Sequence, residues 1–194
     1  MEIIGLTGGI ASGKSTASTI LRTFGATIID ADCLARKVVE KDQLALVELT
    51  TTFGKEILKN NGELNRKRLG EIVFSDKEKL KILNRILHPK INALAISLFE
   101  YERRMGKDKI IYDSPLLVEE NLIDMVDKVW LIYLDKKSQL KRLMERNNFS
   151  KEEALSRINS QMPMVDKLKF ADIIIDNGGS IGDLEKKLRY HWYN

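Results

Sequence analysis

A glycine-rich segment near the N-terminus carries residue types that bind phosphate. Residues 8–15 read Gly-Gly-Ile-Ala-Ser-Gly-Lys-Ser, which matches the pattern G-x-x-x-x-G-K-[ST]. Glycines allow successive backbone N–H groups to point into one concavity, and a helix N-terminus adds partial positive charge. Lys14 can reach the β- and γ-phosphates of a nucleotide, and the Ser15 hydroxyl can hold Mg²⁺. The segment therefore predicts a phosphate-binding loop, or P-loop.

The surroundings of this loop favour the same interpretation. An apolar run, Ile3-Ile4, comes before it, and a helix-like segment, residues 17–24, comes after it, as the strand-loop-helix context of a P-loop requires. A glycine-rich turn that merely starts a helix is the structural alternative. The residues that we expect to bind the nucleotide here are Gly8, Gly9, Ala11, Ser12, Gly13, Lys14, Ser15 and Thr16.

Carboxylates follow two further apolar runs. Asp30 and Asp32 end the run at residues 26–29, and Asp113 ends the run at residues 109–112. In open parallel sheets ligands bind beyond the carboxyl ends of strands, so these acids should lie near the phosphates. Asp30 can instead cap the helix that follows, which leaves Asp32 as the better candidate for chemistry. Asp113 is a candidate Mg²⁺ ligand, directly or through water, or a turn residue before Pro115.

Basic residues late in the chain suggest a lid. The helical segment at residues 138–146 carries Lys141, Arg142 and Arg146, and a capping box at residues 150–153 starts another helix. Arginines on such a hairpin can close over a triphosphate and neutralise the charge that develops during transfer. They can also be ordinary residues of a helix surface.

The elements that must position these residues alternate between apolar runs and helical patterns, which is typical of an α/β fold. We expect a parallel five-stranded sheet with helices on both faces, and its strands at residues 3–6, 26–29, 109–112, 129–134 and 173–175. Residues 42–104 are almost continuously helical in pattern, with a helix start at His88-Pro89. His88 can cap or pack there, or contact substrate.

These patterns predict one P-loop domain with a core, a helical insertion and a lid. The core comprises residues 1–36, 88–137 and 167–194, the insertion residues 37–87, and the lid residues 138–166. The 194 residues suffice for a sizeable core. We find no repeat, low-complexity tract or linker that would separate independent domains.

Composition narrows the class of protein. The net charge of +4 suits an anionic ligand, but no basic block or nucleic-acid-binding motif is present. No apolar run is long enough for a membrane span, and the N-terminus does not resemble a signal peptide. Cys33 is the single cysteine, which excludes internal disulfides and multi-cysteine metal sites. We therefore expect a cytoplasmic protein that binds a small molecule, without nucleic-acid or membrane partners; its oligomeric state stays open.

Subclass signals favour a kinase among P-loop proteins. The chain has no N-K-x-D segment for guanine, and its D-x-x-G match at residues 176–179 follows the last expected strand, too late for a switch loop. Motor ATPases carry an Asp-Glu pair at the end of a strand. In this chain Ser114 follows Asp113 and Lys136 follows Asp135, so neither strand end carries that pair. A lid that excludes water instead suits transfer to an acceptor hydroxyl.

The ordered motifs resemble those of the dephospho-coenzyme A (dephospho-CoA) kinases over essentially the full length. The elements that carry the resemblance are the P-loop, Ile29-Asp30-Ala31-Asp32 with Ala35-Arg36, His88-Pro89, Asp113-Ser114-Pro115-Leu116-Leu117-Val118-Glu119, Gln139-Leu140-Lys141-Arg142, Arg157 with Gln161, and Ala171-Asp172 with Ile175-Asp176-Asn177. The resemblance implies ATP-dependent phosphorylation of the ribose 3′-hydroxyl of dephospho-CoA, with Mg²⁺, in the last step of coenzyme A synthesis.

The resemblance also assigns roles to residues. It implies that Asp32 accepts or orients the hydroxyl proton, that Arg142 and Arg146 act from the lid, and that Asn177 lies near adenine. It implies that the insertion shelters the pantetheine arm. The catalytic residues are then Asp32, Lys14 and Arg142, the metal ligands Ser15 and Asp113, and the substrate contacts Asp32, Arg36, His88, Asp113 and Leu116.

Two residues depart from the family pattern. Ala11 stands where glycine is usual, which we expect to be tolerable only if Ala11 keeps a negative φ. Asn147 follows Arg146 where aspartate is common, which weakens any Arg-Asp pair in the lid. Two other functions stay open: a P-loop kinase that acts on another small alcohol or phosphate, and a regulatory protein that binds ATP without transferring its phosphoryl group.

Overall fold

The computed structural model describes all residues from 1 to 194, and it divides into two compact units. The first unit comprises Met1–Ile29 and Glu102–Asn194, and the second comprises Asp30–Tyr101. The second unit therefore interrupts the first between the second and third strands of the sheet.

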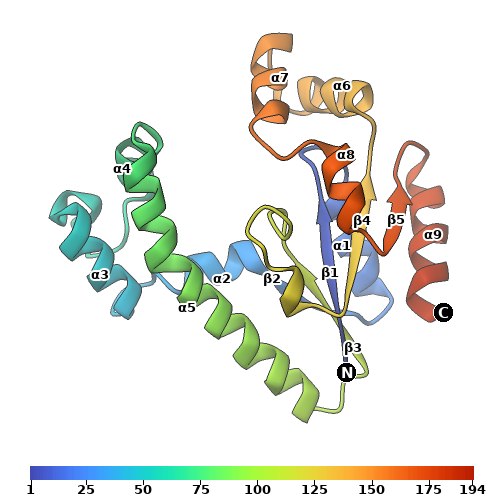
Figure 1. Cartoon of the computed structure of the whole chain (residues 1–194), viewed down its shortest axis with the longest axis horizontal. Helices are drawn as coiled ribbons and strands as arrows, with labels where there is room; N and C mark the ends of the chain where they lie inside the picture. The colour runs from blue at the N-terminus through green and yellow to red at the C-terminus, as the bar shows by residue number, and fades with distance from the viewer. The chain divides into compact units, whose positions relative to one another are not determined.

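A five-stranded sheet organises the first unit (Figure 1). Its strands are β1 (Glu2–Gly8), β2 (Thr27–Asp30), β3 (Lys109–Asp113), β4 (Lys128–Tyr133) and β5 (Ile173–Asp176). They lie in the order β2-β3-β1-β4-β5, and β1 pairs in parallel with both β3 and β4. The predicted parallel sheet is confirmed, and its central strand leads directly into the glycine-rich loop.

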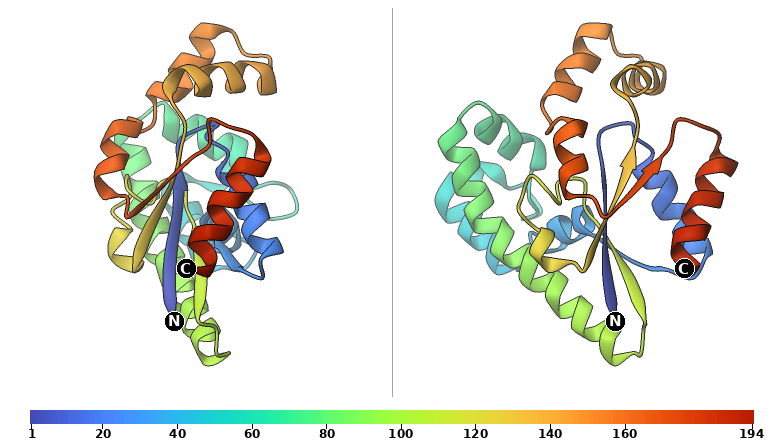
Figure 2. Two further views of the ribbon diagram at one scale, coloured as in Figure 1. Left: turned by 90° about the vertical axis from the view of Figure 1, so that its right-hand side faces the viewer. Right: turned by 45° about the vertical axis from the view of Figure 1, so that its right-hand side comes forward.

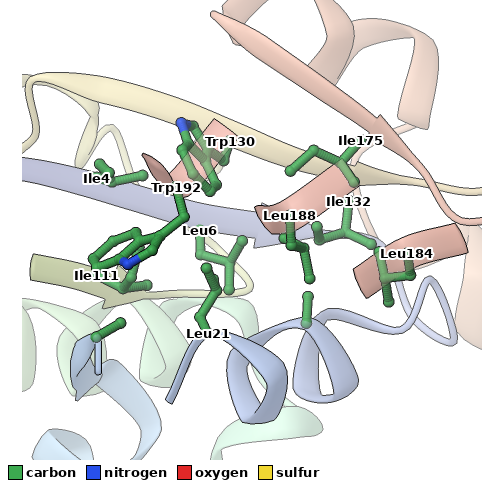
Figure 3. Packing of buried hydrophobic residues seen from close by; sticks show 12 residues of the cluster. Ile4, Leu6, Leu21, Ile111, Trp130, Ile132, Ile175, Leu184, Leu188 and Trp192 are labelled. Atoms are coloured by element: carbon green, nitrogen blue, oxygen red, sulfur yellow. The ribbon is translucent and has the colours of Figure 1, made fainter. Parts of the chain in front are cut away.

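The middle of each central strand is buried and mostly apolar, as is usual for a parallel sheet that is covered on both faces. The helices α1 (Lys14–Thr23) and α9 (Ile181–Tyr193) lie side by side and pack on one face of the sheet. Figure 3 shows this contact, where Leu21, Leu188 and Trp192 of the helices meet Leu6 and Trp130 of the strands. Each fully buried side chain of this kind contributes roughly 1.5–3 kcal/mol to folding. The start of α1 is thereby fixed beside the end of β1.

A helical hairpin follows β4 (Figure 2). It consists of α6 (Lys136–Asn147) and α7 (Lys151–Asn159), and α8 (Met164–Lys167) leads the chain back towards β5. Asp135 caps α6 by accepting a hydrogen bond from Ser138 N, and the predicted capping box of α7 is present, with Ser150 and Glu153 bonded reciprocally. Asn148 adopts a left-handed conformation between the helices, with φ of 53°. Short 3₁₀ turns complete the unit at Ile123–Met125 and Leu168–Phe170.

The second unit is helical and has its own core. Its elements are α2 (Ala31–Lys37), α3 (Leu44–Phe53), the 3₁₀ turn Lys55–Ile57, α4 (Arg66–Phe74) and α5 (Lys77–Arg104), whose last turn belongs to the first unit. Leu46 and Leu49 of α3 and Leu69 and Val73 of α4 are buried, and the N-terminal part of α5 packs against them. The chain turns between these helices at Gly54 and at Gly62, each with a positive φ.

The predicted helix start at His88-Pro89 is wrong, because Pro89 lies inside the 28-residue helix α5. A proline within a helix removes one backbone hydrogen bond and costs about 3 kcal/mol. Leucines and isoleucines on both sides of Pro89, among them Leu83, Ile86 and Ile91, pack against the core of this unit. Their combined burial outweighs the local cost of the proline, so the helix continues through it. No helix in the structure combines the length and the apolar character that crossing a membrane requires.

Candidate active site

The glycine-rich loop connects the end of β1 to the start of α1 and leaves the helix N-terminus free. Gly13 occupies the N-cap position with φ of 93°, and no side chain caps the helix there. The first backbone N–H groups of a helix have no intrahelical partner, so those of Lys14, Ser15 and Thr16 are available to a ligand. Together with the helix dipole they form an anion site.

A cavity of about 830 Å³ opens over this loop. Ten of the predicted site residues line it: Gly8, Gly9, Ala11, Gly13, Lys14, Ser15, Thr16, Arg142, Arg146 and Asn177. The loop, the first helix of the hairpin and the segment after β5 therefore contribute to one site. The volume is within the range of small-molecule sites.

Lys14 and Asp113 form an ion pair beside the cavity, between Lys14 Nζ and Asp113 Oδ1. Both side chains are largely buried, with 18% of Lys14 and 6% of Asp113 exposed. Asp113 ends β3, which pairs with β1, so the sheet register brings the carboxylate to the loop. Burial of the neighbouring Tyr112 raises its pKa to about 12, so this phenol stays neutral.

Ala11 has a positive φ of 60°, so the expectation of a negative φ at this position is wrong. For a residue with a Cβ the left-handed conformation costs about 1–2 kcal/mol. Such strain persists only where surrounding contacts determine the backbone. The loop therefore needs partners that hold it on both sides of Ala11.

Asn177 and Arg142 hold the second half of the loop. The Asn177 side-chain amide donates to Ser12 O at 2.7 Å, and Arg142 Nη2 donates to Asn177 O at 2.8 Å. A Cβ on Gly13 would lie 2.1 Å from Asn177 Nδ2, so only glycine fits there. Ser12, which we expected to bind the nucleotide, is buried and does not line the cavity. Its backbone, and not its side chain, is therefore the part of Ser12 that can serve the loop.

Two glutamines hold the first half of the loop. Gln139 Nε2 of α6 donates to Ile10 O at 2.8 Å, and Ile10 N donates to Gln161 Oε1 at 2.7 Å. The resemblance includes both glutamines, but the sequence alone assigned neither of them a role. Their partners are backbone atoms more than 120 positions away, which no local pattern could reveal.

Arg146 differs from Arg142 because its side chain is exposed. Its Nε donates to Asn147 Oδ1 at 2.9 Å, so the asparagine amide oxygen accepts where a carboxylate is common in the family. Glu145 also lines the cavity, between these two arginines in sequence, and was not predicted. Arg157 lies over the Phe149 ring, 4.4 Å from its centre, within the hairpin.

A buried lysine fixes the loop that follows β3. Lys167 is completely buried, and its Nζ lies 2.8 Å from Glu119 Oε1 and donates to Pro115 O at 3.0 Å. Pro115 lines the cavity, and its carbonyl also accepts a hydrogen bond from Thr7 Oγ1. Leu116, a predicted substrate contact, is 39% exposed on this loop. The sequence could not identify Lys167, because most lysines are exposed.

The remaining predicted site residues belong to the second unit. Asp30 is the N-cap of α2, and its carboxylate accepts hydrogen bonds from Asp32 N at 2.8 Å and Cys33 N at 3.1 Å. The capping alternative for Asp30 is thus confirmed. Asp32 is exposed in the first turn of α2, Arg36 is exposed in the last turn, and His88 is half-buried in α5.

Comparisons with known proteins extend over nearly the whole chain. The family model described as CoaE, dephospho-CoA kinase, matches residues 2–183. A dephospho-CoA kinase of Carboxydothermus hydrogenoformans is 46% identical over 97% of this chain and 91% of its own length.

Solved structures agree with the sequence comparison. TT1252 from Thermus thermophilus superimposes with a TM-score of 0.83 at 35% identity, covering 99% of this chain and 96% of its own. Dephospho-CoA kinase from Campylobacter jejuni superimposes with a TM-score of 0.77 at 35% identity, covering 98% and 95%. With the P-loop site and this near-complete match, the chain belongs to the dephospho-CoA kinase family.

Proposed function

We propose that this protein transfers the γ-phosphoryl group of ATP to the 3′-hydroxyl of the ribose of dephospho-CoA. The products are ADP and coenzyme A, in the final step of coenzyme A biosynthesis. The match of residues 2–183 to the family, with an intact P-loop cavity, is the observation that supports this most strongly. As a small-molecule kinase the protein acts in the cytoplasm and needs no nucleic-acid or membrane partner.

The loop and the hairpin provide the donor site. The backbone of residues 8–16 surrounds the phosphates, and Asn177 lies near adenine. Lys14 exchanges Asp113 for phosphate oxygens when ATP binds, because a triphosphate carries more negative charge than one carboxylate. Arg142 and Arg146 neutralise charge that develops on the transferring group, and residues 138–166 close as a lid that excludes water.

Ser15 and Asp113 are the proposed Mg²⁺ ligands. Ser15 lines the cavity and Asp113 adjoins it through Lys14, and their hydroxyl and carboxylate oxygens are the hard donors that Mg²⁺ prefers. The bound ion would neutralise negative charge on the β- and γ-phosphates. The release of Asp113 by Lys14 therefore makes the carboxylate available for this role.

Asp32 is the proposed general base for the acceptor. Asp30 is already occupied as a helix cap, whereas the Asp32 side chain is exposed and free to accept a proton. Arg36, His88, Asp113 and Leu116 are the further substrate contacts that the family pattern suggests. Residues 37–87, the proposed insertion, shelter the pantetheine arm.

The test is a coupled assay of ADP release with purified protein, ATP, Mg²⁺ and dephospho-CoA, in which mass spectrometry identifies the product. We expect a product that is one phosphoryl group heavier and that coenzyme A-dependent enzymes accept. Nucleoside monophosphates and shikimate are parallel acceptors. Brisk phosphorylation of one of these without turnover of dephospho-CoA would overturn the proposal, and tight ATP binding without any transfer would favour a regulatory protein.

A further inference from the structure

Two glutamine side chains bind the backbone N–H and C=O groups of Ile10, a residue of the P-loop. Ile10 N donates to Gln161 Oε1, and Ile10 O accepts from Gln139 Nε2, at 2.7 Å and 2.8 Å. Gln139 lies in the first turn of α6, and Gln161 follows α7. The two ends of the α6–α7 hairpin thus hold the same residue of the phosphate-binding loop.

Ile10 directly precedes Ala11, the residue with the unfavourable backbone conformation. Ile10 O belongs to the peptide group on the N-terminal side of Ala11, whose φ is 60°. On the other side, Ser12 N donates to Gly9 O at 3.1 Å, and Ser12 O accepts from Asn177 Nδ2. A rotation of Ala11 to negative φ would turn these peptide groups and break the contacts.

We propose that Gln139 and Gln161 are positioning residues that keep the P-loop in its phosphate-binding form by holding Ala11 in the left-handed conformation. This inference rests on the proposed binding of a nucleotide in the cavity. It assigns the glutamines no contact with the reacting atoms; they act through the backbone of Ile10, although Gln161, unlike Gln139, also lines the cavity. It also implies that residues 139 and 161 stay with the loop in any movement of the hairpin, so that only residues between them move.

The size of the effect follows from the preference of alanine against positive φ. A tenfold preference of alanine for negative φ corresponds to about 1.4 kcal/mol. Without both glutamine hydrogen bonds, about one molecule in ten would then keep the loop in its phosphate-binding form. The apparent Kd of a nucleotide would then rise about tenfold. Glycine adopts either sign of φ about equally, so with Ala11→Gly the same loss should cost only about twofold.

The experiment measures binding of ADP by titration calorimetry to the full chain in two backgrounds, the parent and Ala11→Gly. Gln139→Met keeps the volume of the side chain but cannot donate to Ile10 O, and Gln139 does not line the cavity. Gln161 still holds Ile10 N in this variant, so we expect the Kd to rise severalfold, to at most about tenfold, in the parent background and by no more than about twofold with Ala11→Gly. This rescue is the sign of a positioning role, because glycine at position 11 cannot replace a lost contact with the nucleotide.

Gln161→Met is the second variant, and Asn159→Ala is the matched control. Asn159 accepts a hydrogen bond from Lys136 between α6 and α7, so its loss loosens the hairpin without touching the loop. We expect Asn159→Ala to leave the Kd within about twofold in both backgrounds, since the bond is exposed. Equal losses of affinity in both backgrounds for the two glutamine variants would overturn the inference, as would no loss at all. Absence of ADP binding by the parent would instead overturn the proposed function and this inference with it.

Discussion

Lys14 and Asp113 form a largely buried ion pair at the end of β3, so replacing one of them affects both binding and stability. We expect Lys14→Met to lower kcat/KM by about 10³, since removing one such cationic contact to a transferring phosphoryl group costs about 10²–10³ or more. It should also lower the free energy of unfolding by about 3 kcal/mol, because Asp113 keeps a buried charge without its partner. Steady-state kinetics and urea unfolding measure the two effects.

The double variant Lys14→Met with Asp113→Asn separates these two effects. The neutral amide no longer needs a cation, so most of the lost stability should return. Activity should not return, because neither the lysine nor the carboxylate is restored. A double variant no more stable than Lys14→Met would contradict this account of the ion pair.

Gly13 and Gly25 allow the effect of one contact in the loop to be isolated. Both have left-handed backbones, with φ of 93° and 87°, but a Cβ on Gly13 would meet Asn177 whereas a Cβ on Gly25 would meet nothing within 4 Å. Gly25→Ala should therefore destabilise the protein by about 1–2 kcal/mol through backbone strain alone. Gly13→Ala should cost at least about 1 kcal/mol more, because Asn177 must leave Ser12 O.

Urea unfolding of the two variants gives this difference directly. Nucleotide affinity should fall for Gly13→Ala and stay unchanged for Gly25→Ala, which lies at the C-terminal end of α1 and away from the cavity. Equal destabilisation by the two substitutions would show that Asn177 does not constrain the loop.

At the scale of elements, Lys167 and Glu119 connect α8 to the segment after β3. We expect Lys167→Met to destabilise the protein by about 3 kcal/mol, near the low end for breaking a buried pair, because 18% of the Glu119 side chain is exposed. Adding Glu119→Leu should restore most of that loss, since an apolar pair can replace a buried ion pair. Lys128→Met removes an exposed pair with Glu2 and should cost less than about 1 kcal/mol. Chemical denaturation of the four proteins tests the ranking.

The cap of α6 should make the hairpin sensitive to acid. Hydrogen bonds from the Ser138 hydroxyl and from its backbone N–H lower the pKa of Asp135 below its ordinary value of 3.8. The folded state has the lower pKa, so the cap stabilises the protein above pH 3.8, and this contribution is lost as the pH falls through the folded pKa. Asp135→Asn keeps an acceptor but does not titrate. The Tm advantage of the parent over this variant should therefore be full near neutral pH and shrink below pH 3.8.

Sequence patterns predicted the elements and the ligand-binding loop but not the contacts that hold them. The P-loop, the five strands and the caps at Asp30 and Ser150 depend on short spacings, so they could be predicted. Pro89 was misplaced because packing on both sides of it outweighs a local rule. Ala11 and Lys167 depend on partners far along the chain, and no local signal reports such partners.

At the scale of the whole molecule, the two units divide the proposed tasks. The first unit contains the complete lining of the cavity, which includes the P-loop and Arg142. The second unit contains Asp32, together with Arg36 and His88. Donor binding should therefore depend on the first unit, and activation of the acceptor on a residue of the second.

Asp32→Asn tests this division of tasks, because it removes a base and changes nothing in the cavity lining. We expect kcat to fall by at least about a hundredfold, the scale of general-base catalysis, while the affinity for ATP stays within about twofold. Asp30→Asn is the matched control, since asparagine also caps helices and should keep nearly full activity. Binding measured by calorimetry and turnover measured by ADP release distinguish the two steps. Full activity of Asp32→Asn would show that another group takes the hydroxyl proton, and a parallel loss of ATP affinity would show that Asp32 serves the donor site instead.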